Sequence, residues 1–200
     1  MRFIGCRRAF IAVCICFAAI CAPVASAQAP RTSVYAGYES LIGEWEVTPA
    51  AGGAPVAIER FSWGPGNSYI WFAVSVAAGR GMEPHFEGML VWNGVNRNLD
   101  MLLVLDLAGG RVQESGTFSI TQEGFLRDIM ATYSEGTRPT ATSAPAGPEG
   151  LRVAFRQTFE RLGPDRMRTR LQRREGGTWV PTFPGSDNLI MTRRRSDAAS

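Results

Sequence analysis

The sequence predicts a single all-β domain with one short helical segment near its start. Glycine, proline and asparagine interrupt the chain at short intervals, and the runs between them have strand length. Within these runs apolar and polar residues alternate, as over 151–162, where Val153, Phe155 and Phe159 share a face opposite two arginines. No apolar pattern with helical spacing is long enough for a globular helix. About ten antiparallel strands joined by short turns are compatible with a sandwich or a closed barrel.

The predicted elements follow one another with short connections. A helical segment is expected over 34–41. The strands are expected over 42–47, 56–63, 69–76, 86–92, 99–107, 111–121, 125–133, 151–162, 166–174 and 187–193, with Thr178 and Trp179 capping a hairpin. The strand over 99–107 is apolar on both faces apart from Asp100 and Asp106, so we expect a neighbouring segment to cover it. Residues 134–150 are rich in Pro, Ala, Gly, Ser and Thr, which predicts a long flexible loop, and 196–200 form a tail.

The first 27 residues are expected to be a signal peptide. Arg2, Arg7 and Arg8 precede an apolar run over 9–22 that is too short to span a bilayer, and small residues allow cleavage after Ala27. Residues 28–33 are then a disordered lead-in, and 34–195 form the domain. We therefore expect a periplasmic or secreted protein with no transmembrane segment after cleavage.

Two other interpretations of this segment stay open. Arg7 and Arg8 resemble the twin-arginine export pattern, which would imply export of the folded protein. Cys21 is a possible acylation site, although the branched Ile20 stands where a small residue is expected.

Composition excludes several classes of function. All 21 basic residues of the 200-residue chain are arginine, and the four cysteines lie within the first 21 residues. Residues 28–200 have 18 arginines, 18 acidic residues and no cysteine. The expected mature protein therefore has no disulfide scaffold, cysteine metal site or cysteine nucleophile, and its zero net charge argues against nucleic acid. We expect neither a metal nor a cofactor, because no motif for either is present.

A short motif suggests a family for this barrel. Gly43-Glu44-Trp45 follows the helical segment and resembles the G-x-W motif of lipocalins and the wider calycin superfamily. The resemblance implies a lipocalin-like barrel of about eight to ten strands, in which Trp45 closes one end and stacks on an arginine of the last strand, here Arg193. Trp92 before Asn93 and Gly94 is also similar to small exported bacterial lipocalin-like domains of unassigned function.

The chain departs from this family in three respects. The Thr-Asp-Tyr loop motif of true lipocalins is absent, and the strands outnumber the lipocalin eight. The ten-stranded haem-binding members have a histidine near the C-terminal end, whereas the only histidine here is His85. The resemblance therefore does not imply haem binding.

These observations predict an exported, non-catalytic protein that binds a small, mainly hydrophobic molecule inside the barrel. The aromatic residues expected to line the binding site are Trp63, Trp71, Trp92, Phe155 and Phe159. A protein partner is not predicted by any pattern.

Two alternative functions stay open. An enzyme would use His85 or a carboxylate of the barrel interior as a base, but because His85 follows Pro84 we expect it to lie in a turn before the fourth strand. A cell-envelope interaction module would use an arginine-rich outer face, because residues 151–195 have 11 arginines and only four acidic residues. Pairing of those arginines with acidic residues of the first strands, including Glu44 and Glu46, would explain the same asymmetry.

Overall fold

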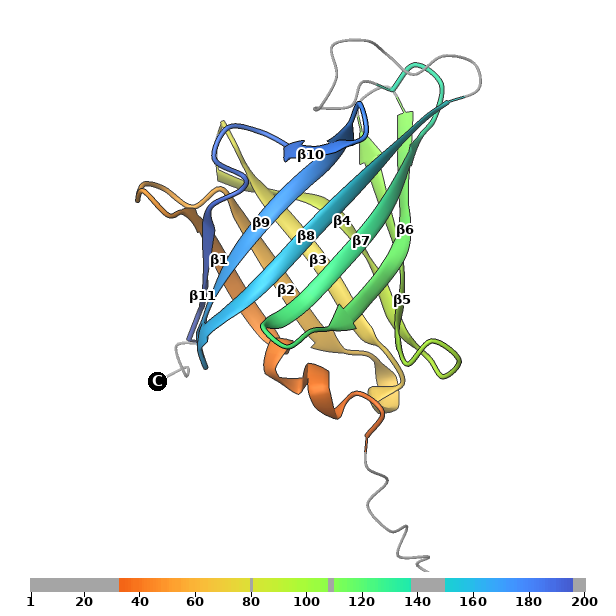
Figure 1. Ribbon diagram of the computed structural model, residues 1–200, viewed down its shortest axis with the longest axis vertical. Helices are drawn as coiled ribbons and strands as arrows, with labels where there is room; N and C mark the ends of the chain where they lie inside the picture. The colour runs from red at the N-terminus through yellow and green to blue at the C-terminus, as the bar shows by residue number, and fades with distance from the viewer. Residues whose placement is uncertain (1–32, 80, 108–109, 138–149, 196–200) are drawn as a thin grey trace, which may run out of the picture. The chain divides into compact units, whose positions relative to one another are not determined.

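Strand pairing closes the chain into an antiparallel β-barrel, which confirms the predicted fold class (Figure 1). The computed structural model describes residues 33–79, 81–107, 110–137 and 150–195. The expected signal peptide, nearly all of the lead-in, most of the 134–150 loop and the tail lie outside these residues, as does the side chain of Asp106.

The described residues form two short 3-10 helices and eleven strands. The helices are η1 (Ala36–Leu41) and η2 (Pro65–Asn67). The strands are β1 (Gly43–Pro49), β2 (Ala57–Trp63), β3 (Ile70–Ala78), β4 (Gly81–Asn93), β5 (Asn98–Leu107), β6 (Gly110–Ile120), β7 (Gly124–Tyr133), β8 (Leu151–Gly163), β9 (Arg166–Glu175), β10 (Thr178–Pro181) and β11 (Leu189–Arg193).

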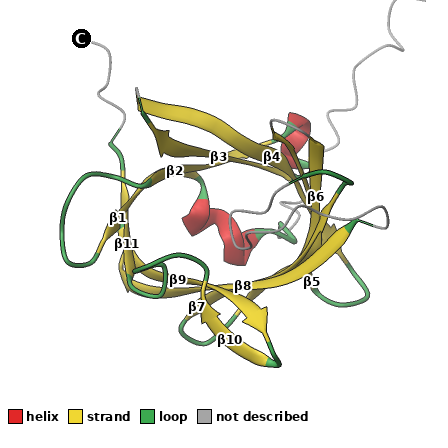
Figure 2. Cartoon of the chain, turned by 90° about the horizontal axis from the view of Figure 1, so that it is seen from above, coloured by secondary structure: helices red, strands yellow, loops and turns green. Residues whose placement is uncertain are grey.

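Ten of these strands close the barrel within the described part of the chain. Each strand from β1 to β9 pairs with the next, and β11 completes the ring between β9 and β1. β10 pairs only with the last part of β9. Figure 2 shows the ring along the barrel axis, with η1 inside its outline. Closure leaves few free strand edges, which suits a chain rich in short strands.

One end of the barrel is closed by η1 and aromatic side chains. Tyr38 and Leu41 of η1 are fully buried, and the Tyr38 ring stacks on Phe125 with 6.0 Å between ring centroids. The Tyr38 hydroxyl donates a hydrogen bond to the carbonyl oxygen of Phe118 at 3.1 Å. This end is therefore packed as a conventional core, with its polar group satisfied.

Trp45 and Arg193 join the first and last strands at the same end. The Trp45 side chain is buried, and its Nε1–H donates to the carbonyl oxygen of Leu41 at 2.7 Å. The Arg193 guanidinium lies 4.2 Å from the Trp45 ring centroid and donates to the carbonyl oxygens of Ser40, at 2.6 Å, and Ile42. Gly43 has a φ of +136°, and a Cβ there would lie 2.5 Å from Arg193 Nη1, so only glycine fits this contact.

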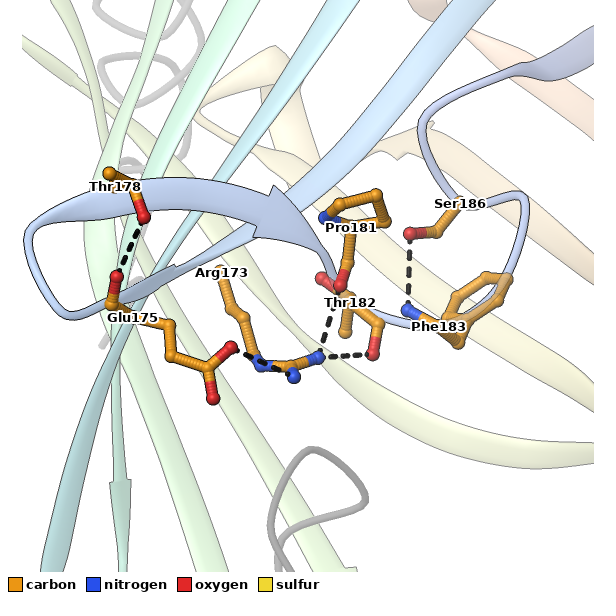
Figure 3. A network of polar contacts seen from close by, with 7 residues as sticks. All are labelled: Arg173, Glu175, Thr178, Pro181, Thr182, Phe183 and Ser186. Carbon is orange, nitrogen blue, oxygen red and sulfur yellow. Dashed lines mark hydrogen bonds and ion pairs between the residues drawn. The ribbon is translucent and has the colours of Figure 1, made fainter.

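β10 lies at the end of the barrel opposite η1 (Figure 1), and hydrogen bonds hold the loop that follows it against β9 (Figure 3). Arg173 Nη1 donates to the carbonyl oxygens of Pro181 at 3.0 Å and Thr182 at 2.8 Å. The Ser186 hydroxyl accepts the N–H of Phe183 at 3.2 Å. These bonds fix the path by which the chain leaves β10 and enters β11.

One local expectation was wrong. His85 does not lie in a turn before the fourth strand: β4 begins at Gly81, and His85 sits at a register shift where Val74 pairs with Phe86 but Ser75 pairs with Pro84. The extra residue of a bulge lets the strand continue past a proline, which has no N–H to donate. Leu102 and Val104 on the outward face of β5 are exposed, and the lead-in and the 134–150 loop, either of which was expected to cover this strand, lie almost wholly outside the described residues. No helix in the described residues is long and apolar enough to cross a membrane.

Candidate functional site

A group of polar side chains occupies the apolar interior of the barrel. Glu59 on β2, Arg127 on β7, Gln157 on β8 and Thr169 on β9 are each at most 6% exposed, and the side chain of Glu114 on β6 is 14% exposed. Each falls on the inward face of its strand because side chains alternate with period two. We call these five residues the interior polar cluster.

The cluster is connected by hydrogen bonds and charge. Gln157 Nε2 donates to Glu59 Oε1 and to Thr169 Oγ1, both at 3.1 Å. Arg127 Nη2 lies 4.0 Å from Glu114 Oε2, which is an ion pair without hydrogen-bond distance. β2, β6, β7, β8 and β9 thus all contribute to one site.

Aromatic rings surround the guanidinium of Arg127. Its Cζ lies 5.1 Å from the ring centroid of Phe72 and 5.6 Å from that of Phe86. These contacts stabilise the cation through the electron-rich ring faces. The Nε and Nη1 groups, which lie in the guanidinium plane, have no hydrogen-bond acceptor among the described residues.

Four polar atoms of the cluster are buried without a hydrogen-bond partner among the described residues: Glu59 Oε2, Glu114 Oε2, Arg127 Nε and Arg127 Nη1. We call them the open atoms. A buried polar atom left without a partner costs about 1–3 kcal/mol, and more when it is charged. A site that tolerates four of them is suited to a molecule that completes their hydrogen bonds.

Burial shifts the pKa of every ionisable group in the cluster. It raises the pKa of Glu59 and of Glu114, and in both cases the positive charge of Arg127 opposes the shift. Burial also lowers the pKa of Arg127, against the attraction of the two carboxylates. Nearby on β7, burial and then the charge of Glu114 raise the pKa of Tyr133 to about 12, so its phenol stays neutral. Charge inside the barrel is therefore costly.

Of the aromatic residues predicted to line the site, Phe155 and Phe159 lie closest to the cluster along the chain. They are buried on β8 on either side of Gln157, all three facing inward. Trp63 and Trp92 pack on the core at the η1 end. The Trp63 ring centroid is 5.7 Å from that of Tyr35, and the Trp92 backbone N–H donates to the Tyr35 hydroxyl at 3.1 Å.

Trp71 is not in the interior. It alternates with buried Ile70 and Phe72 on β3 and lies on the outer wall, in a groove of about 660 Å³. His85 lines the same outer groove, and burial lowers its pKa. The histidine is thus separated from the interior polar cluster by the barrel wall.

Several arginines of the outer wall form ion pairs with acidic side chains. Arg156 binds Asp128 at 2.8 Å, and Arg168 binds Glu160 at 3.0 Å. Glu44 lies between Arg60 and Arg194, and its pKa is lowered by the hydrogen bond and charge of Arg60 and then by Arg194. Two of these ion pairs, Arg156 with Asp128 and Arg194 with Glu44, join the arginine-rich C-terminal strands to acidic residues of earlier strands.

Sequence reasoning missed Glu59, Glu114 and Arg127. Each is a charged residue on the apolar face of its strand: Glu59 is in phase with Phe61, and Arg127 with Phe125. This alternation was the one feature of the sequence that could have placed these charged residues inside the barrel.

Neither a search for metal-binding groups nor comparisons with known proteins assign a function to this site. The residues that the structure describes contain no group of three or more His, Cys, Asp or Glu side chains able to hold a metal ion. Neither the protein-family models nor the curated proteins include a match to this chain.

Proposed function

We propose that this protein is an exported, lipocalin-like barrel that binds a small, mainly apolar molecule in its interior and does no chemistry on it. The observation that carries the proposal is the set of open atoms within the apolar interior. An apolar wall provides binding energy of about 25 cal/mol for each Å² of apolar area that a ligand buries, and a few polar groups orient it.

Two features support the lipocalin-like part of the proposal. The G-x-W segment is followed by a closed antiparallel barrel, and Trp45 packs under Arg193 where first and last strands meet. The expected signal peptide supports export.

The test is a fluorescence titration with N-phenyl-1-naphthylamine, an apolar probe that brightens when water is excluded from it. We expect saturable one-to-one binding to the wild-type protein. Phe155→Leu changes the interior next to the cluster, and Trp71→Ala is the control, because it removes a larger aromatic side chain from the outer wall. Because the ligand binds inside, Phe155→Leu should change the affinity severalfold while Trp71→Ala leaves it unchanged.

Two results would reject the proposal. The first is the absence of saturable probe binding to folded wild-type protein. The second is loss of binding in Trp71→Ala together with unchanged binding in Phe155→Leu, which would place the probe in the outer groove. Thermal melting of both variants verifies that they are folded.

A further inference from the structure

The interior polar cluster has more negative than positive groups. It holds two carboxyl groups, Glu59 and Glu114, and one guanidinium, Arg127. With all three ionised, the interior keeps one negative charge in excess. Such a charge in a region of low dielectric constant is strongly unfavourable, so the excess requires a proton or a bound cation.

The open atoms show what a bound molecule must supply. Glu59 Oε2 and Glu114 Oε2 require hydrogen-bond donors, and Arg127 Nε and Nη1 require an acceptor. A protonated amine donates up to three N–H groups and adds the missing positive charge. An oxygen next to the amine, as in a hydroxyl or carbonyl, would accept from the guanidinium.

We propose that the interior recognises an apolar molecule whose polar end is a protonated amine with a neighbouring hydroxyl or carbonyl oxygen. This inference rests on the proposed function and specifies its ligand class. Glu59 and Glu114 hold the nitrogen, Arg127 holds the oxygen, and the side chains on either side of the cluster, including Phe155, contact the apolar chain.

The opposite choice, a fatty carboxylate held by Arg127, conflicts with the charge count. A ligand carboxylate would be the third acidic group around one guanidinium, and neutrality would require two protons. A simple alcohol adds no charge and completes fewer hydrogen bonds. The cluster therefore orders head groups as amino alcohol, amine, alcohol and carboxylate, from tightest to weakest.

The experiment compares ligands that share one alkyl chain and differ only in the head group. Each of 1-amino-2-decanol, decylamine, decan-1-ol and decanoate is titrated below its aggregation concentration, by calorimetry and by displacement of N-phenyl-1-naphthylamine, at neutral pH. We expect the two amines to bind at least about tenfold more tightly than decanoate. The ammonium group neutralises the excess negative charge of the cluster, whereas the carboxylate of decanoate adds to it. The amino alcohol should exceed decylamine severalfold.

Glu114→Gln is the informative variant, because it removes one negative charge while keeping the side-chain shape. We expect it to lower the ratio of decylamine to decanoate affinity by about tenfold. Glu44→Gln makes the same chemical change on the outer wall and should leave the ratio unchanged. If Glu114→Gln fails to fold, Glu59→Gln serves instead. The comparison of decylamine with decanoate on the wild-type protein tests the proposal without any variant.

The outcomes separate the two proposals. Decanoate binding as tightly as decylamine, or an unchanged ratio in a folded Glu114→Gln protein, overturns the amine assignment and leaves the binding function intact. Binding of the apolar probe without any of the four alkyl ligands also overturns it. Failure of both the probe and the four ligands rejects the proposed function itself.

Discussion

The two halves of the barrel interior differ in how their polar groups are satisfied. At the η1 end, Tyr38 donates to a carbonyl of β6, and Trp45 donates to Leu41 under the guanidinium of Arg193. At the level of the interior polar cluster, Glu59 and Arg127 are equally buried but keep open atoms. Similar burial therefore goes with a satisfied hydrogen bond for Tyr38 and Trp45 and with open atoms for Glu59 and Arg127.

This difference separates stability from function. A region with every buried polar group paired contributes to the free energy of unfolding, whereas open atoms reduce it and persist where a ligand completes them. Substitutions at the η1 end should therefore act mainly on stability, and substitutions in the cluster mainly on binding and on pH dependence.

The largest effect is expected for Trp45→Ala at the η1 end. Removing this buried ring should lower the free energy of unfolding by about 3–5 kcal/mol, because a large side chain is lost and a cavity remains. Trp71→Ala on the outer wall removes the same side chain from a partly exposed site. Urea denaturation of both proteins measures the difference, and equal losses would break the distinction between the packed end and the outer wall.

A smaller effect is expected for Arg193→Lys. Lysine cannot stack flat on Trp45, and it lacks the two separate nitrogens with which the planar guanidinium reaches both carbonyl oxygens, so the free energy of unfolding should fall by about 2 kcal/mol. The neighbouring Arg194 is exposed and pairs with Glu44 on the outer wall, so Arg194→Lys should cost less than about 0.5 kcal/mol. Comparable losses in thermal or chemical denaturation would show that the stacked arginine does not hold this end together.

The interior polar cluster should affect how the free energy of unfolding depends on pH. Because the pKa of Glu59 is raised in the folded state, the folded protein binds its proton more tightly than the unfolded chain. Stability from this group is present below the usual carboxyl pKa and is lost as the pH rises through the raised value. Glu59→Gln removes this loss, so its free energy of unfolding should fall less than that of wild type as the pH rises from the usual carboxyl pKa into the neutral range. Identical slopes would contradict the charged interior.

The smallest effect is expected for the outer-wall carboxylate Glu44. Because its pKa is lowered, its effect on stability depends on pH in the opposite way to that of Glu59. The stability that Glu44 contributes is present above the usual carboxyl pKa and is lost as the pH falls through the lowered pKa. Glu44→Gln should cost less than about 1 kcal/mol at neutral pH, since Arg60 is largely exposed. The cost should shrink further in molar salt, and a loss that salt does not reduce would argue against a surface ion pair.

Much of the fold follows from residue patterns. Turn residues located most strands to within a residue or two, and the alternation over 151–162 placed Phe155 and Phe159 inside. The start of β4 was misplaced because proline and histidine indicate a turn locally, whereas the bulge at His85 depends on pairing with β3. Closure into a barrel depends on β11 meeting β1, a contact between distant segments.

The candidate site was harder to predict, for a physical reason. Glu59, Glu114 and Arg127 belong to three different strands, β2, β6 and β7. Only the closed barrel brings their side chains together. Charged side chains are more typical of an outer wall, whereas the parity of these three residues places them inside. Conversely, Trp71 was predicted inside because of its aromatic character, while its alternation with Ile70 and Phe72 places it outside. Parity was more informative than residue type in both cases.

The most direct test of ligand binding in the interior is a proton–nitrogen correlation spectrum recorded during titration with 1-amino-2-decanol. Two side chains serve as reporters: the Nε–H of Arg127 inside the barrel and the indole N–H of Trp71 on the outer wall. We expect the Arg127 resonance to shift saturably and the Trp71 resonance to stay in place. A saturable shift of Trp71 with an unmoved Arg127 resonance would contradict the account.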